Sequence, residues 1–111
     1  MRFLLVLAVL ASMSACPRTP EQQQADAARS DARQRGGTIE NRADAEADRL
    51  QQQASDLENQ AAQAGGMTGE RLRIRAKALD QESKVVRKQA YMQADAIKED
   101  ADAHIKASKS R

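Results

Sequence analysis

The stretch that decides the fold is residues 61–72, which read Ala-Ala-Gln-Ala-Gly-Gly-Met-Thr-Gly-Glu-Arg-Leu. It holds three of the five glycines of the chain. Gly65 predicts the end of a helix, because glycine enters the left-handed conformation without a steric penalty. Thr68 predicts the cap of a second helix, with Glu70 in its first turn. We therefore expect a Gly-rich turn over residues 65–69, formed by Gly65, Gly66 and Gly69.

The segments on both sides of this turn have the composition of long helices. Residues 21–111 contain no proline, and Ala, Gln, Glu, Lys and Arg, which all favour helix, dominate them. We expect a first helical arm over 21–64, a second over 70–108 and a tail over 109–111. The adjacent glycines Gly36 and Gly37 indicate a possible break in the first arm.

Apolar residues follow a helical period along both arms and predict a core. After the turn, the spacing averages 3.67 residues, with an extra four-residue step between Ala90 and Ala94 that locally unwinds a left-handed supercoil. Most of the stripe is alanine. The large side chains expected in the hairpin core are Ile39, Leu50, Leu57, Leu72, Leu79, Val86, Ile97 and Ile105.

A hairpin folded at the glycines pairs residues whose numbers sum to about 133. In this register a large side chain lies opposite a small one in most layers, for example Leu57 opposite Ala76 and Ala54 opposite Leu79. Such alternation is what close interdigitation of two helices requires. The sequence thus predicts an all-α protein, a long antiparallel two-helix hairpin or alanine-rich coiled coil. Pairing between two chains would satisfy the same rules.

Charge favours the same register. Residues 21–64 carry nine acids and five bases, and residues 65–111 carry seven acids and eleven bases. The two arms therefore have opposite net charge. The register predicts ion pairs between Glu46 and Arg87, between Asp56 and Lys77, and between Glu58 and Arg75. Exposed pairs of this kind contribute about 0.2–1 kcal/mol each, so they select orientation more than they stabilise the fold.

Composition restricts the classes of function. From Cys16 onward, 33 of 96 residues are hydrophobic and 19 of these are alanine, and Ile, Leu, Val and Phe together number ten. So few large side chains exclude an ordinary globular core and an enzyme with a shaped apolar pocket. They leave an elongated helical protein or a disordered one. We expect no enzymatic activity, no cofactor and no small-molecule substrate.

The remaining candidate sites are better explained by ordinary helix chemistry. His104 and Asp100 lie four residues apart, which indicates a solvated ion pair, because two ligands are too few for a specific metal site. The basic run Arg71, Arg73, Arg75 and Lys77 is interpreted as facing acidic residues within the hairpin, not as a nucleic-acid site. Tyr91 and Met92 are expected to pack beside the core. Ile74 and Val85 lie off the main stripe, which is a weak indication of a second, oligomeric contact.

The N-terminus has the pattern of an export signal. Residues 1–15 contain Arg2, an apolar run from Phe3 to Ala11 and small residues before Cys16, the only cysteine. Ser14-Ala15-Cys16 resembles the lipobox of bacterial lipoproteins. That resemblance implies that residues 1–15 are removed and that Cys16 carries the lipid. A plain secretory signal with an incidental cysteine is the alternative. Residues 16–20, which include Pro17 and Pro20, are expected to form an extended tether.

The whole chain is similar in plan to murein-lipoprotein-type helical lipoproteins: a lipidated cysteine, a short tether and a helical rod. This resemblance implies an exported protein bound to the membrane through lipid on Cys16, in the outer membrane facing the periplasm if the host has two membranes. The expected role is structural or interactive, through self-association, an envelope protein or peptidoglycan. The alternatives are a hydrophilic stress protectant similar to late embryogenesis abundant proteins and an accessory subunit of an envelope complex.

Overall fold

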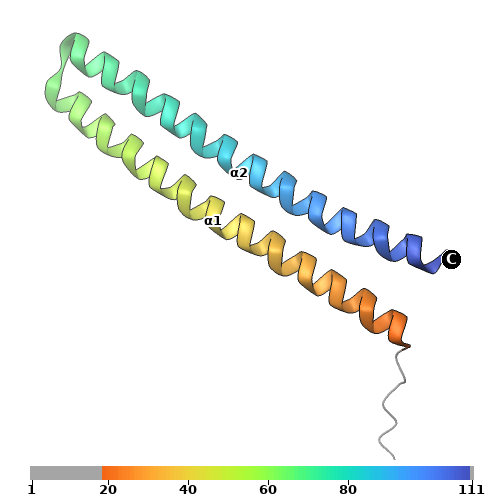
Figure 1. Cartoon of the computed structure of the whole chain (residues 1–111). Helices are drawn as coiled ribbons and strands as arrows, with labels where there is room; N and C mark the ends of the chain where they lie inside the picture. The colour runs from red at the N-terminus through yellow and green to blue at the C-terminus, as the bar shows by residue number, and fades with distance from the viewer. Residues whose placement is uncertain (1–18, 111) are drawn as a thin grey trace, which may run out of the picture.

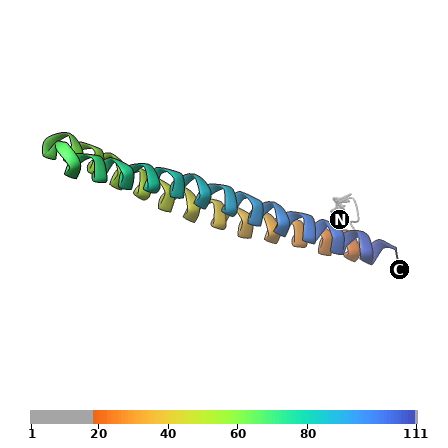
Figure 2. The same ribbon diagram turned by 90° about the horizontal axis from the view of Figure 1, so that it is seen from above.

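The computed structural model describes residues 19–110. They form two long helices, α1 (Pro20–Ala64) and α2 (Gly66–Lys109), with no strand between them. The helices run antiparallel and lie side by side along their length (Figures 1 and 2). The predicted all-α helical hairpin is therefore confirmed. The expected signal over residues 1–15 and the lipid-bearing Cys16 lie outside the described residues.

Helix α1 begins earlier than the sequence suggested. Thr19 caps it: the Thr19 Oγ1 accepts a hydrogen bond from the Gln22 backbone N–H at 3.2 Å, and the Thr19 N–H donates to the Gln22 Oε1 at 3.3 Å. This reciprocal arrangement satisfies two of the free N–H groups at a helix start. Pro20 occupies the first helical position, where its missing N–H costs nothing. Pro20 therefore belongs to the helix and Thr19 is its extended cap, while residues 16–18 of the expected tether lie outside the described residues.

The possible break at Gly36–Gly37 does not occur, because α1 continues through both residues. Gly36 is buried in the seam between the helices. A Cβ placed on it would lie 3.3 Å from the Ala94 Cβ, so glycine here allows α2 to approach closely. Gly37 faces open space. Packing against α2 thus holds in place a segment whose intrinsic helix propensity is low.

The turn is one residue long, not the five residues of 65–69. Gly65 lies between the helices with φ 64° and ψ 179°, a conformation that only glycine adopts readily, and Gly66 has φ 58°. The Gly65 N–H donates to the Ala61 carbonyl at 3.0 Å, and the Gly69 N–H donates to the Gly65 carbonyl at 2.9 Å. Helix α2 therefore starts at Gly66, before Thr68, which does not cap it, and it ends at Lys109.

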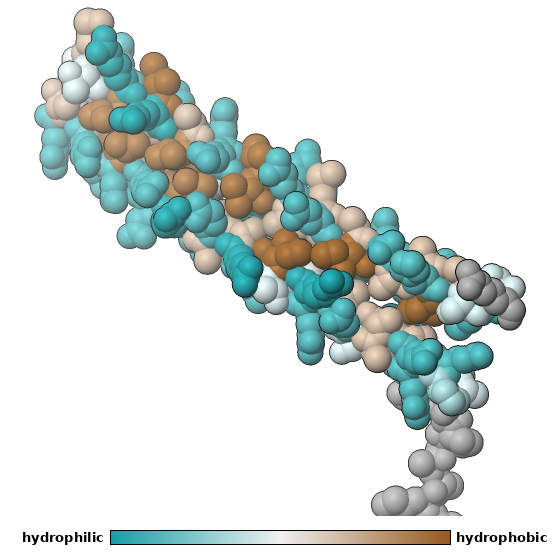
Figure 3. Space-filling view, viewed as in Figure 1, coloured by the Kyte–Doolittle hydropathy of each residue, from teal (hydrophilic) through white to brown (hydrophobic). Residues whose placement is uncertain are grey.

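Small residues occupy the centre of the seam, and large ones border it. Fourteen helical residues are buried, eight in α1 and six in α2, and among them only Leu50 and Ile105 have large side chains. The other expected core residues, Ile39, Leu57, Leu72, Leu79, Val86 and Ile97, are half-buried. Two helices share only one line of contact, so alanine and glycine bring the backbones together while larger side chains cover the edges. Figure 3 shows these hydrophobic side chains as a broken band along the seam.

The contacts between the helices lie in the register centred on the glycines. Gly69 lies against Ala61 near the turn, Gly36 against Ala94 in the middle, and Arg29 against Asp102 toward the open end. Ala90 and Ala94 are both buried, with 6% and 0% of their surface exposed. The four-residue step between them, predicted from the sequence, therefore lies inside the seam opposite Gly36.

Candidate interaction surfaces

A polar cluster connects the two helices at mid-length. The Arg87 Nη2 lies 2.6 Å from the Asp48 Oδ1, and its Nε lies 3.4 Å from the Asp44 Oδ1. Tyr91, one turn further along α2, donates its hydroxyl to the Asp44 Oδ1 at 3.2 Å. One guanidinium and one phenol from α2 thus hold two carboxylates from α1. The cluster links the helices beside the buried alanines Ala43, Ala47 and Ala90.

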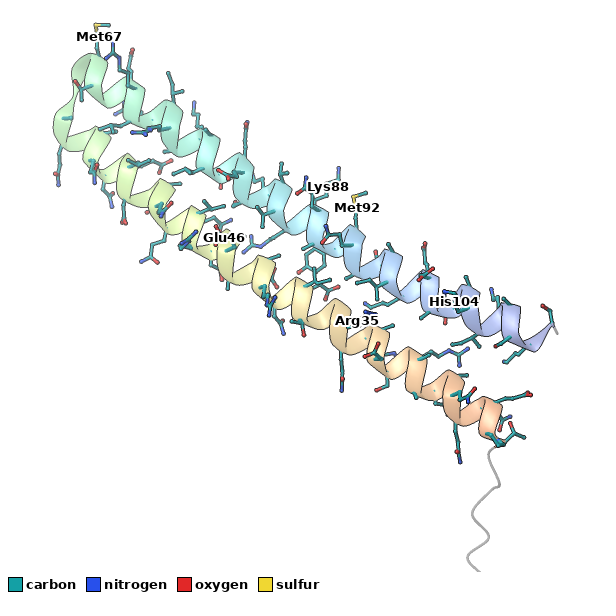
Figure 4. All side chains as sticks on the ribbon, in the orientation of Figure 1. Arg35, Glu46, Met67, Lys88, Met92 and His104 are labelled. Atoms are coloured by element: carbon teal, nitrogen blue, oxygen red, sulfur yellow. The ribbon has the colours of Figure 1, made fainter. Side chains whose placement is uncertain are left out.

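The partner predicted for Arg87 is wrong. Glu46 pairs with Arg49 of its own helix at 2.7 Å, while Arg87 pairs with Asp44 and Asp48, the residues two positions to either side. Figure 4 labels Glu46 on α1. Within residues 19–110, the other two predicted pairs, Asp56 with Lys77 and Glu58 with Arg75, form no ion pair. The sequence register identified the correct turn of the helix, but Asp44 and Asp48 lie on the side of α1 that Arg87 reaches, whereas Glu46 lies on the other side.

Asp44 also changes the acidity of Tyr91. Its negative charge, together with the hydrogen bond that the phenol donates to it, raises the pKa of Tyr91 above the ordinary value. Ionisation of the phenol would place a second negative charge beside the carboxylate, so the neutral form is favoured. Tyr91 is 43% exposed. It therefore lies at the edge of the seam, where its hydroxyl donates to α1. Met92, which was expected beside the core with Tyr91, is 61% exposed.

Further ion pairs cross the seam toward the open end. The Arg29 Nε lies 3.4 Å from the Asp102 Oδ1, and the Lys98 Nζ lies 3.8 Å from the Glu40 Oε1. His104, labelled in Figure 4, lies 3.9 Å from Asp100 of the same helix, and both side chains are largely exposed. Across residues 19–110, no group of three or more His, Cys, Asp or Glu side chains is placed to hold a metal ion.

The basic run near the turn is exposed and does not pair within the hairpin. Arg71, Arg73, Arg75 and Lys77 are all exposed, and none of them forms an ion pair with another described residue. None of the four thus forms the ion pair expected within the hairpin, while Arg75 borders a groove that Asp56 also lines, and Lys77 borders one that Glu58 also lines. A shallow groove bordered by Leu57, Leu79 and Arg75 lies on one side of the seam in this region.

Helix α2 carries a second apolar line on the side away from α1, which we call the outer stripe: Met67, Ile74, Val85 and Met92. Their exposed fractions are 73%, 68%, 51% and 61%. Figure 4 shows Met67 and Met92 pointing away from α1, with Lys88 beside Met92. Exposed alanines, Ala78, Ala96, Ala103 and Ala107, continue the line at helical spacing. The sequence had singled out Ile74 and Val85, while the two methionines that complete the line were not recognised.

Comparison with protein-family models, with curated proteins and with solved structures found no match to this chain. Among the described residues, neither helix combines the length and the apolar character that crossing a membrane requires. The outer stripe and the polar cluster of Asp44, Asp48, Arg87 and Tyr91 are thus the two surfaces on which a function can be argued.

Proposed function

We propose that this protein is a non-enzymatic, lipid-anchored element of the bacterial envelope, in which the hairpin is a rod that contacts other envelope components. On this proposal Cys16 receives the lipid after residues 1–15 are removed, and the rod begins three residues later at Thr19. In a host with two membranes, the rod belongs at the outer membrane and faces the periplasm.

The observation that carries the proposal is the seam of small residues that runs from Ala25 and Ile105 at the open end to Ala61 and Gly69 at the turn. Nearly all buried surface serves to hold two helices together, and the polar groups that cross the seam bind one another. Such a body presents long exterior faces to partners. The pattern of residues 1–16 adds the export signal and the lipid-bearing cysteine.

Metabolic labelling tests the anchor. Cells that express the full chain are grown with an alkyne-bearing fatty acid, and the membranes are then separated by density. We expect the chain to carry the label, to become shorter by the length of the signal and to sediment with the outer membrane. A Cys16→Ala variant should carry no label, while Ser14→Ala, which keeps the small residue before the site, should be labelled normally. Unlabelled wild-type chain released as a soluble periplasmic protein would contradict the proposal.

The second part of the proposal, contact with the envelope, is tested by photocrosslinking in intact cells. A photoreactive amino acid at Gln52, which is exposed on α1, and another at Met92 on the outer stripe report on two different faces. The proposal expects crosslinked products with other envelope components, as distinct from a second copy of this chain, that depend on Cys16, because the anchor brings the rod to its partners. Identical products from the Cys16→Ala variant would contradict a role that depends on the anchor.

A further inference from the structure

The outer stripe of α2 has symmetric spacing. Met67, Ile74, Val85 and Met92 are separated by seven, eleven and seven residues. These steps correspond to about two, three and two helical turns, so the four side chains lie on one line. The midpoint of Met67 and Met92 coincides with that of Ile74 and Val85. A second α2 running in the opposite direction therefore matches this line to itself.

We propose that the outer stripe is a dimer interface, in which α2 packs antiparallel against α2 of a second copy about a two-fold axis between residues 79 and 80. Met67 then lies opposite Met92 of the second copy, and Ile74 lies opposite Val85. Each copy contributes four large apolar side chains that the hairpin alone leaves 51–73% exposed. Burying such a line is the ordinary driving force for helix association.

The charges on either edge of the outer stripe fit the same register. An antiparallel two-fold pairing brings each edge of α2 against the same edge of the second copy. On one edge Glu70 meets Lys88, and on the other Arg75 meets Glu82, in each case within two residues of the centre set by the apolar pairs. Symmetry repeats both, which gives four ion pairs per dimer. Electrostatic complementarity of this kind fixes partner and register.

These four charges have no competing partner within the hairpin. Glu70, Arg75, Glu82 and Lys88 are exposed, and none of them forms an ion pair with another described residue. By contrast, Asp80 and Lys84, which lie closer to α1, pair with each other at 3.1 Å. The four charges therefore form no ion pair inside the hairpin, and Arg75 also borders the groove at the seam together with Asp56 of α1.

The neighbouring polar residues are mixed in this register. Lys77 lies opposite Gln81 of the second copy and Arg71 lies opposite Gln89, whereas Lys77 also comes within two residues of Lys84 of the second copy, which pairs with Asp80 of its own helix. A parallel pairing would bring Asp95 on one edge against Asp100 on the other, which repel, but the same spacing would bring Glu70 against Arg75 and Lys77 against Glu82, which attract. The symmetric spacing of the apolar residues, and not the charges, therefore favours antiparallel association of two hairpins, in the order α1, α2, α2, α1. This inference does not depend on the lipid at Cys16.

Disulfide trapping between two differently tagged full chains tests the register. One chain carries Ile74→Cys and the other Val85→Cys, and both are expressed in the same cells and oxidised in isolated membranes. We expect a mixed disulfide dimer when both variants are present. Each variant expressed alone should give no more disulfide-linked dimer than the wild type, because identical positions lie eleven residues apart along the interface. The wild-type yield reports any contribution of Cys16. Ile74→Cys with Ala96→Cys is the matched control, since Ala96 is on the same line but beyond the overlap.

A charge reversal tests the predicted ion pair between Arg75 and Glu82 of the second copy. When Glu82→Arg is added to both the Ile74→Cys and the Val85→Cys chain, two arginines lie against each other, and we expect the yield of mixed disulfide to fall about tenfold or more. Adding Arg75→Glu to both chains restores the opposite charges and should restore the yield. Glu99→Arg, outside the overlap, should leave the yield unchanged. Far-ultraviolet circular dichroism verifies that every variant remains helical.

Four results would overturn the proposal. The first is a yield of mixed disulfide dimer no higher than the wild-type level from the Ile74→Cys and Val85→Cys mixture, although both variants remain helical. The second is efficient trapping of Ile74→Cys with itself, which would indicate a parallel dimer. The third is loss of trapping in the Glu82→Arg variant without recovery in the double reversal. Binding of a helical, monomeric chain to lipid vesicles through Met67 and Met92 would also contradict the dimer, because the stripe would then be a membrane contact.

Discussion

Gly69 lies directly against Ala61 at the point where the two helices leave the turn. A Cβ added to Gly69 would approach the Ala61 carbonyl oxygen to 2.7 Å, which is too short for any stable contact. Ala61 itself is fully buried. The third glycine of the turn region therefore sets how closely the helices approach, while Gly65 and Gly66 with their positive φ angles reverse the chain.

Replacing Gly69 by alanine should destabilise the hairpin. The obstacle is backbone and cannot rotate away, so the first turn of α2 must shift, at a cost of about 1–3 kcal/mol in the free energy of unfolding. Urea unfolding followed by circular dichroism measures this. An alanine variant at least as stable as the wild type would show that the helices do not cross as closely as described.

The adjacent glycines of α1 should respond differently to alanine. At Gly37 nothing lies within 4 Å, so Gly37→Ala should stabilise the helix by roughly 0.5–1 kcal/mol through its higher propensity. At Gly36 the new methyl group would meet the Ala94 Cβ at 3.3 Å, and the same gain should be largely cancelled. Thermal unfolding of the two variants checks the difference. Equal stabilisation by both would argue against a seam at Gly36.

Ser83 should tolerate alanine but not leucine. It is fully buried, and its hydroxyl donates to the Asp80 backbone carbonyl at 2.6 Å, within its own helix. We expect Ser83→Ala to change the free energy of unfolding by less than about 0.5 kcal/mol, because no cross-helix bond is lost. Ser83→Leu should destabilise by about 1–3 kcal/mol, since the seam has no room for the larger side chain. A leucine variant of unchanged stability would contradict close packing there.

The pKa of Tyr91 should fall when Asp44 is neutralised. The wild-type pKa is raised, chiefly by the Asp44 charge, so this contact adds stability below pH 10, the ordinary tyrosine pKa, and loses it as pH rises through the folded pKa. Tyr91 is the only tyrosine, and the chain has no tryptophan, so ultraviolet absorbance of the tyrosinate reports it directly. Asp44→Asn should lower the pKa more than Glu40→Gln does, because Glu40 is a lesser cause. An equal or opposite response would place Tyr91 away from Asp44.

Much of the fold follows from local sequence. The glycines at 65 and 66 identify the reversal, and the helical period of the apolar residues identifies the faces that meet. The expected layers of large against small are not what forms, because small residues meet small ones at the centre, as Gly36 meets Ala94, and the large side chains cover the edges. What escaped prediction depends on contacts between the arms. A pair of glycines indicates a helix break in isolation, yet Gly36 is helical because it packs on Ala94. Likewise, Gly69 belongs to the second helix and not to the turn. Its glycine is required by contact with Ala61 of the first helix, which local sequence does not reveal.

The candidate surfaces were less predictable for related reasons. Arg87 pairs with Asp44 and Asp48, which are four residues apart and share one side of α1, whereas Glu46 lies two residues from each and is directed to the other side. Helical spacing carried this distinction, but the register by itself did not show on which side of the seam Arg87 lies. Nothing in the sequence around Met67 and Met92 indicated that they belong to the outer stripe. Their heptad spacing from Ile74 and Val85 is informative only once α1 is known to cover the opposite side of α2.

The hairpin requires that its two helices pair within one chain. Spin labels at Gln24→Cys and Ser108→Cys, in a Cys16→Ser background, place one label at the open end of each helix. The labelled chain is diluted into an excess of unlabelled chain, so that distances between chains do not contribute. Pulsed electron spin resonance should give a distance on the order of 20–30 Å, from adjacent helices plus the label linkers. A single extended helix would separate the same positions by roughly 125 Å, and loss of the short distance on dilution would contradict the hairpin.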